Sequence, residues 1–291
     1  MSLDLAVLLL VLLSAVFHAT WNALVKADGD KLVMQTYVIC VPGLVSLLLL
    51  PFLPAPDPAS WPFLAASVVI HGIYYATLLY AYKHGDLSQV YPIARGMAPA
   101  LVALFAWLLA AEALSGPEIL GLAILSGGII SLSRLARLLS RLERPREGEI
   151  KAIVFAVLTA LTICGYITAD GLGVRLAGAK FGYIAWLLFL ESLPLLAFAL
   201  WARRGRLAAA FRPPLVKGGL GGLIAGAGYA IAIWAMSVAP LAHVVAVRET
   251  SVIIAAYIGT RVMGEPFGRR RVAAAFAVAA GAALLNIGAS W

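Results

Sequence analysis

The chain has 291 residues, of which 63% are hydrophobic and only 12% are charged, against about 25% charged residues in soluble domains. A mean hydropathy of +0.96 excludes an ordinary soluble protein, because so apolar a chain has too little polar surface to cover its core. The net charge of +8 does not indicate a nucleic-acid partner, since the basic residues lie between apolar segments and form no stripe or arm.

Ten apolar segments of about 20 residues follow one another along the chain, each long enough to cross a bilayer of about 30 Å. Only helices and closed barrels satisfy the backbone in lipid, and strict two-residue alternation is absent. We therefore expect an all-α polytopic membrane protein with helices at approximately 4–25, 32–53, 61–82, 87–111, 118–135, 151–170, 181–201, 215–237, 240–263 and 270–289.

The lysines and arginines of the loops predict the orientation of the helices. Seventeen lie near the loops that follow the odd-numbered helices, whereas the other face has Arg175 and Lys180. Because cytoplasmic loops carry the excess of basic residues, we expect the odd loops inside the cell and both termini outside. The expected location is a bacterial-type inner membrane.

Two stretches half a chain apart repeat one pattern. Arg95 and Arg248 each precede a glutamate, Glu112 and Glu265, by seventeen positions, and the offset is 153 in both cases. Five helices in each half is an odd number, so the second half enters the membrane from the opposite face. This arrangement predicts inverted repeats, which place a substrate site near the midplane.

The predicted organisation has three parts. A first five-helix repeat covers residues 1–135, a basic cytoplasmic linker covers 136–150, and a second repeat covers 151–291.

Several motifs resemble one family. "HATWNALVKA", "AAEALSGPEILGLAILSGGI" and "MGEPFGRR…AAGAALLNIG" look like the first helix and the glutamate-then-glycine-rich fifth helices of EamA-type proteins in the drug/metabolite transporter superfamily. The resemblance implies ten helices in two repeats, metabolite efflux across the membrane, and no cofactor. It does not identify the substrate.

Arg95 is the first candidate for substrate binding, because a charge at bilayer depth costs about 3 kcal/mol and needs a cavity or a partner. Its guanidinium could grip a carboxylate or phosphate, with Tyr91 one turn earlier on the same face and Pro92 opening the helix backbone. The alternative is a structural ion pair with Glu191 or Glu249.

Arg248 is the second candidate cation. Glu249 follows it directly, so the two side chains point in directions about 100° apart and each needs another partner. Glu249 and Glu191 are each expected either to carry a coupling proton or to form a static ion pair with an arginine. Two arginines and two glutamates balance, which keeps the static network open.

The remaining candidates for substrate contact are polar or aromatic. His18 and Asn22 share a face of the first helix, and Trp21, Tyr166 and Trp234 are candidate walls of the cavity. Four other features are expected to be structural: His71 and His243 as packed polar residues, Asp170 as a solvated residue at a helix end, and Gly218, Gly222 and Gly226 as a ridge for close helix packing.

Catalytic and metal-binding motifs are absent from the sequence, which has no HExxH, phosphate-binding loop or CxxC. We therefore expect no enzyme activity, catalytic residue, metal or cofactor. The favoured function is secondary transport, in the export direction, of a small anionic or zwitterionic metabolite such as an amino acid or organic acid. The alternatives are a cationic-drug/proton antiporter and a membrane protein that handles lipids or phosphates. The expected partners are the metabolite and membrane lipids, with the chain a monomer or homodimer.

Overall fold

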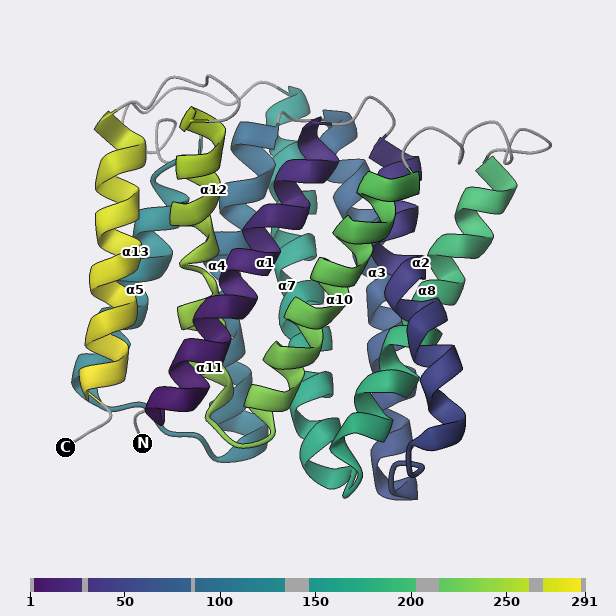
Figure 1. Ribbon diagram of the computed structural model, residues 1–291. Helices are drawn as coiled ribbons and strands as arrows, with labels where there is room; N and C mark the ends of the chain where they lie inside the picture. Colours follow the sequence, from purple (N-terminus) through teal and green to yellow (C-terminus); the bar gives the residue numbers. More distant parts are fainter. Residues whose placement is uncertain are drawn as a thin grey trace.

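The computed structural model describes residues 3–27, 31–84, 87–133, 147–202, 215–261 and 269–288, and all elements in these ranges are helical (Figure 1). Eight helical segments are long and apolar enough to cross a membrane, and two shorter apolar helices lie in the fifth and tenth predicted positions. The predicted class, an all-α polytopic membrane protein, is confirmed.

The helices follow the predicted segments closely. The first half contains two 3-10 turns, Leu50–Phe52 and Pro58–Ser60, and the helices α1 Leu5–Ala27, α2 Lys31–Leu49, α3 Trp61–His84, α4 Leu87–Ala110 and α5 Gly116–Ile130. The second half contains α7 Glu147–Leu176, α8 Lys180–Ala202, α10 Leu215–Met236, α11 Leu241–Arg248, α12 Ser251–Arg261 and α13 Arg269–Gly288.

The ninth predicted helix, 240–263, is in fact two helices, α11 and α12, separated at Glu249 and Thr250. The Thr250 backbone N–H donates to the carbonyl of Val247, and the Thr250 hydroxyl donates to the same oxygen over 2.7 Å. These short-range bonds replace the regular α-helical pattern and end α11 in a tight turn. A break at membrane depth is tolerated where the backbone is buried in protein or lines a cavity.

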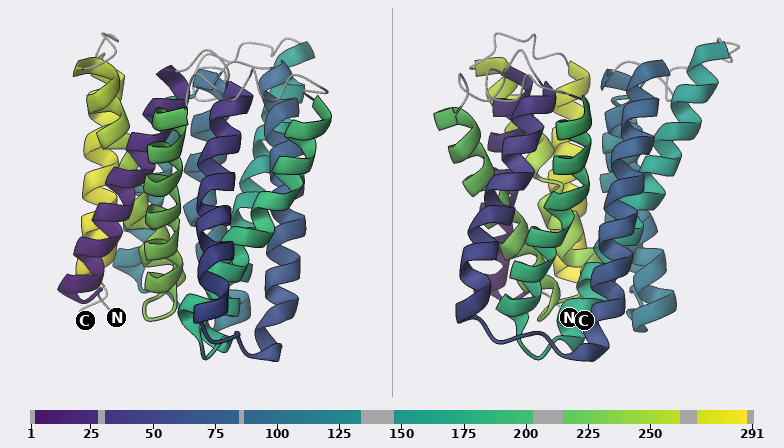
Figure 2. Two further views of the ribbon diagram at one scale, coloured as in Figure 1. Left: turned by 45° about the vertical axis from the view of Figure 1, so that its right-hand side comes forward. Right: turned by 90° about the vertical axis from the view of Figure 1, so that its right-hand side faces the viewer.

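Helices from the two halves pack against one another. α3 packs on α7 and its counterpart α10 packs on α1, while α2 pairs with α8 and α5 with α13 (Figures 1 and 2). α4 also packs on α7, as α11 and α12 pack on α1. These reciprocal pairings are those that a two-fold relation between the halves requires. The repeat boundaries remain predictions, and Glu265 and most of the linker 136–150 lie outside the described residues.

Small residues allow two of these helix pairs to approach closely. The predicted ridge of Gly218, Gly222 and Gly226 on α10 lies against Tyr37, Val41 and Pro42 of α2. This confirms its role in close packing.

The α5–α13 pair is closer still. A Cβ built on Gly121 would lie 2.7 Å from the carbonyl oxygen of Gly281, and one built on Gly281 would meet the Gly121 carbonyl in turn. Only glycine permits this approach of two backbones.

The described ends of the chain, the start of α1 and the end of α13, lie at the same face of the molecule (Figures 1 and 2). We call this the terminus face. α3 begins there at Trp61, α7 ends there at Leu176, and α11 begins there at Leu241.

Candidate functional site

Charged and polar side chains of several helices meet near the middle of the bundle, whichever face the helices start from. Arg95 lies eight residues into α4, about 12 Å from its start, and His71 lies ten residues into α3 from the terminus face, about 15 Å. We call the group the central site, and its members are His18, Ser67, His71, Tyr91, Arg95, Tyr166, Asp170, Glu191, Tyr229, Arg248 and Glu249.

Arg95 forms an ion pair with Glu249, with 2.7 Å between Nη2 and Oε1, and both side chains are almost completely buried. Of the two interpretations of Arg95, the structure shows the ion pair. Tyr91 lies one turn before Arg95 on α4 and is one of its electrostatic neighbours. Arg95 Nε and Glu249 Oε2 have no hydrogen-bond partner, so the pair rests on one contact between the two charged groups.

Arg248 is held by neutral groups. Its Nη2 lies 3.4 Å from Nδ1 of His18, and its guanidinium carbon lies 5.2 Å from the centre of the Tyr229 ring. Among the residues that the structure describes, no carboxylate forms an ion pair with Arg248, and its Nε has no hydrogen-bond partner. The side chain is half-buried, so Arg248 is a cation with no carboxylate partner among the described residues.

Asp170 is completely buried, which contradicts its expected place as a solvated residue at a helix end. The apolar run pauses at this acid, but α7 continues to Leu176. The helix can continue because the hydroxyl of Tyr229 donates to Oδ2 of Asp170 over 2.5 Å.

His71 links a second acid to this group. Its Nε2 lies 3.4 Å from the carboxylate of Glu191, and its Nδ1 lies 3.2 Å from the Ser67 hydroxyl and 3.0 Å from the Ser67 carbonyl. The imidazole stacks on Tyr166 with 4.0 Å between the ring centres. His71 is therefore packed, as expected, but it also belongs to the central site.

The other predicted wall residues are placed differently. Trp21 meets His18 edge-on with 5.2 Å between ring centres, so it lies at the Arg248 side of the site. The Asn22 amide donates to the backbone carbonyl of His18 over 2.7 Å, which satisfies it within α1. Trp234 packs against the apolar core near the terminus-face end of α10.

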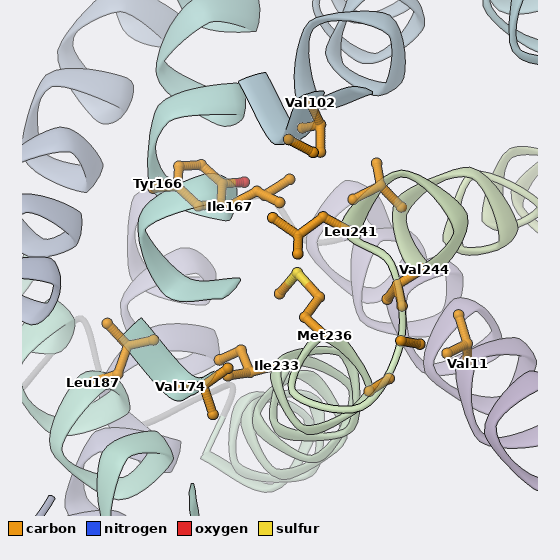
Figure 3. Packing of buried hydrophobic residues seen from close by; sticks show 14 of the residues in the cluster. Val11, Val102, Tyr166, Ile167, Val174, Leu187, Ile233, Met236, Leu241 and Val244 are labelled. Carbon is orange, nitrogen blue, oxygen red and sulfur yellow. The ribbon is translucent and has the colours of Figure 1, made fainter. Parts of the chain in front are cut away.

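Apolar side chains lie between the central site and the terminus face, in what we call the apolar layer, and Figure 3 shows how they pack together. Each member lies nearer that face than the polar residue of the same helix; the layer contains Val11, Val102, Val174, Leu187, Ile233, Met236, Leu241 and Val244. Side chains packed this tightly leave little room for water. The central site is thus closed on this side.

An ion pair lies outside this layer, at the terminus face. Arg175 contacts Glu112 over 2.6 Å and donates to the carbonyls of Met236 and Ala239, while Glu112 accepts from the backbone N–H of Leu241 over 2.8 Å. We call Glu112 and Arg175 the terminus latch. It ties the end of α7 to the α4–α5 and α10–α11 connections.

Helix packing differs between the two halves among the described residues. α7 and α10 pack against each other, whereas their counterparts in the other half, α3 and α1, make no packing contact of similar extent among the described residues. The described residues thus close the terminus face, where α7 and α10 pack together.

A second histidine–acid pair lies apart from the central site. His243 Nε2 lies 2.9 Å from Glu118, whose carboxylate also accepts from the backbone N–H of Ser115 at the start of α5. His243 is therefore a packed polar residue, as expected.

Sequence reasoning missed Asp170, Tyr229 and Ser67 as members of the central site. The signal for Asp170 was present, because an acid within a membrane segment is a functional candidate by default. Its place at the apparent end of an apolar run concealed this. Tyr229 and Ser67 have no signal of their own, since both are common in packed helices.

Membrane-spanning helices around a buried charged centre define a polytopic protein with an intramembrane polar site. Residues 5–134, a little less than half of the chain, match the sequence model of the EamA-like transporter family. A solved structure, described only as "Crystal structure of protein", is similar over 97% of this chain and 98% of its own, with a TM-score of 0.72 and 14% identity. This likeness extends the shared fold over both halves. No curated protein matches the chain.

Proposed function

We propose that the protein is a secondary transporter that moves a small zwitterionic metabolite, with amino acids as the type, by alternating access. The observation that carries this proposal is that, among the described residues, Arg248 has no ion-pair partner, while the nearby acids Asp170 and Glu191 form no ion pair with an arginine. Arg95 and Glu249 cancel each other. What remains for a ligand is one cation, Arg248, and the acids Asp170 and Glu191.

Tyr229 contacts both Arg248 and Asp170 and so fixes the position of one relative to the other. The guanidinium of Arg248 lies over its ring, while its hydroxyl donates to Asp170. A ligand carboxylate can bind Arg248 bidentately and its ammonium group can approach the acids, with both charges satisfied away from water. A purely anionic ligand fits less well, because Asp170 and Glu191 repel it.

Alternating access supplies the transport step. The apolar layer and terminus latch close one side, and inverted repeats would provide an equivalent closure on the other. If the odd loops lie in the cytoplasm, as the charge bias predicts, the terminus face is the outer one, and its closure supports access to the central site from inside. Substrate would enter from the cytoplasm and leave by export.

Proteoliposomes loaded with a ¹⁴C-labelled L-amino-acid mixture test this function. Wild-type protein should move the label, Arg248→Gln should abolish the movement, and Arg248→Lys should keep part of it because the charge remains. Arg261→Gln is the matched control, since Arg261 is exposed at the end of α12 on the same segment. Transport by Arg248→Gln at the wild-type rate would contradict the proposal.

A cationic-drug antiporter is the second candidate, because Asp170 and Glu191 lack arginine partners among the described residues. Labelled tetraphenylphosphonium distinguishes it. A cation transporter should move this probe, and Arg248→Gln should leave or increase the rate, since it removes a repelling charge.

A further inference from the structure

Among the described residues, Arg248 is held by two side chains from different helices. Its guanidinium carbon lies 5.2 Å from the centre of the Tyr229 ring on α10, and its Nη2 lies 3.4 Å from Nδ1 of His18 on α1. The face of a ring attracts the guanidinium without selecting one of its N–H groups. The contact with His18 is directional, because it joins one named donor to one acceptor, so it decides where the other N–H groups point.

The place of Arg248 in the fold makes such a restraint necessary. Arg248 is the last residue of α11, and the helix is broken directly after it, at Glu249 and Thr250. Its Nε is buried without a hydrogen-bond partner. A long arginine side chain loses rotamer freedom when it binds, so a guanidinium grips a carboxylate well only if its neighbours already hold it in the binding orientation.

The contact also assigns a state to each ring nitrogen of His18. A guanidinium donates hydrogen bonds and accepts none, so Nδ1 of His18 must offer a lone pair to Nη2 of Arg248. His18 is therefore the neutral tautomer with its hydrogen on Nε2. A hydrogen on Nδ1 would point at a donor, and Arg95 is a second positive charge near the imidazole.

The surroundings of His18 suit this role. Trp21 meets the imidazole edge-on with 5.2 Å between ring centres, and Asn22 donates to the backbone carbonyl of His18 over 2.7 Å. Both lie within about one turn of His18 on α1, and α1 packs on α11 and on α12. The imidazole is thus supported by its own helix and placed against the break that carries Arg248.

We propose that His18 is a positioning residue of the substrate site: its Nδ1 accepts from Nη2 of Arg248 and orients the guanidinium so that the remaining N–H groups are left for the substrate carboxylate. This inference rests on the proposed function of Arg248. It changes the expected role of His18, which acts on the substrate through Arg248 instead of touching it.

Histidine ¹⁵N NMR of the full chain in lipid tests the arrangement without any substrate. The chain has four histidines, and His18→Asn identifies the His18 signals by removing them. Nδ1 of His18 should have the shift of an unprotonated nitrogen that accepts a hydrogen bond, and Arg248→Met should move it. Arg261→Gln should leave it unchanged. A hydrogen on Nδ1 of the wild-type protein, or a Nδ1 shift that ignores Arg248→Met, overturns the inference.

Two substitutions of His18 separate positioning from packing in the transport assay. The amide oxygen of an asparagine lies near the place of Nδ1 and can accept from Arg248, whereas a leucine of similar bulk cannot. His18→Leu should raise the KM for the labelled amino acid about tenfold or more, with a smaller change in maximal rate, and His18→Asn should recover most of this loss. His84→Leu is the control, because His84 lies at the end of α3, where its Nδ1 contacts the Tyr80 carbonyl.

A wild-type KM in His18→Leu, or equal losses in His18→Leu and His18→Asn, would show that Nδ1 does not position Arg248. The NMR result keeps this inference separate from the proposed function. If the Nδ1 shift responds to Arg248→Met as expected but the wild-type protein moves no amino acid, the contact between His18 and Arg248 stands and the proposed substrate fails.

Discussion

Removal of one partner of the Arg95–Glu249 pair should destabilise the protein strongly. Glu249→Gln leaves the Arg95 guanidinium buried without a counter-ion, and Arg95→Gln leaves the carboxylate in the same state. Breaking a buried pair costs about 3–5 kcal/mol. The pair joins a single nitrogen and a single oxygen, so we expect a loss at the lower end of this range, about 3 kcal/mol, for either change.

The double variant separates an ion pair from two independent contributions. In Arg95→Gln/Glu249→Gln, two neutral amides face each other and no buried charge is left, so at least half of the lost stability should return. Against a summed loss of about 6 kcal/mol for the two single changes, the expected coupling is about 3 kcal/mol, at the upper end of the range known for contacting residues. Reversible unfolding in mixed micelles, followed by tryptophan fluorescence, measures all four proteins.

Arg261→Gln is the control for loss of an arginine, and it should change stability by no more than about 0.5 kcal/mol because the side chain is exposed. Additive losses in the double variant, or a Glu249→Gln protein as stable as wild type, would refute the account of this pair.

Three further predictions concern packing, gating and orientation. Gly121→Ala should destabilise the protein by about 1–3 kcal/mol, because the added methyl group pushes α5 away from Gly281 of α13. Gly127→Ala, which faces open space on the same helix, is the control and should be neutral or stabilising. Unfolding titrations that rank the two variants in the other order would contradict this packing. Glu112→Gln weakens the terminus latch. A cysteine introduced by Ala239→Cys should therefore react faster with an impermeant maleimide in the Glu112→Gln background than with Glu112 present. Equal reaction rates in the two backgrounds would argue against a gate at this face. A periplasmic alkaline-phosphatase fusion at the C-terminus should be active, and an inactive one would reverse the predicted orientation.

Hydropathy predicts the spans well because each must supply about 20 apolar residues, and the described helices lie where these runs occur. The break between α11 and α12 could not be predicted in the same way. It depends on Thr250 bonding back to Val247, and "VRETSVII" is equally compatible with a continuous helix. The break therefore depends on local hydrogen bonds, which amino-acid composition does not predict.

The candidate site shows the same division. Arg95, Arg248, Glu191 and Glu249 were identifiable because charges within apolar runs need partners. Their pairing was not, since both glutamates were possible partners for Arg95. Asp170 was misplaced because the apolar run was ended at the acid itself, although hydrogen bonds allow the helix to continue through it.

Transport of labelled amino acids by the purified protein is the most direct test of the central claim that Arg248 is the free cation that receives a substrate carboxylate. The account predicts movement of label in wild-type and Arg261→Gln proteoliposomes and its loss in Arg248→Gln, with that variant still folded. Equal transport by Arg248→Gln and wild type would contradict it.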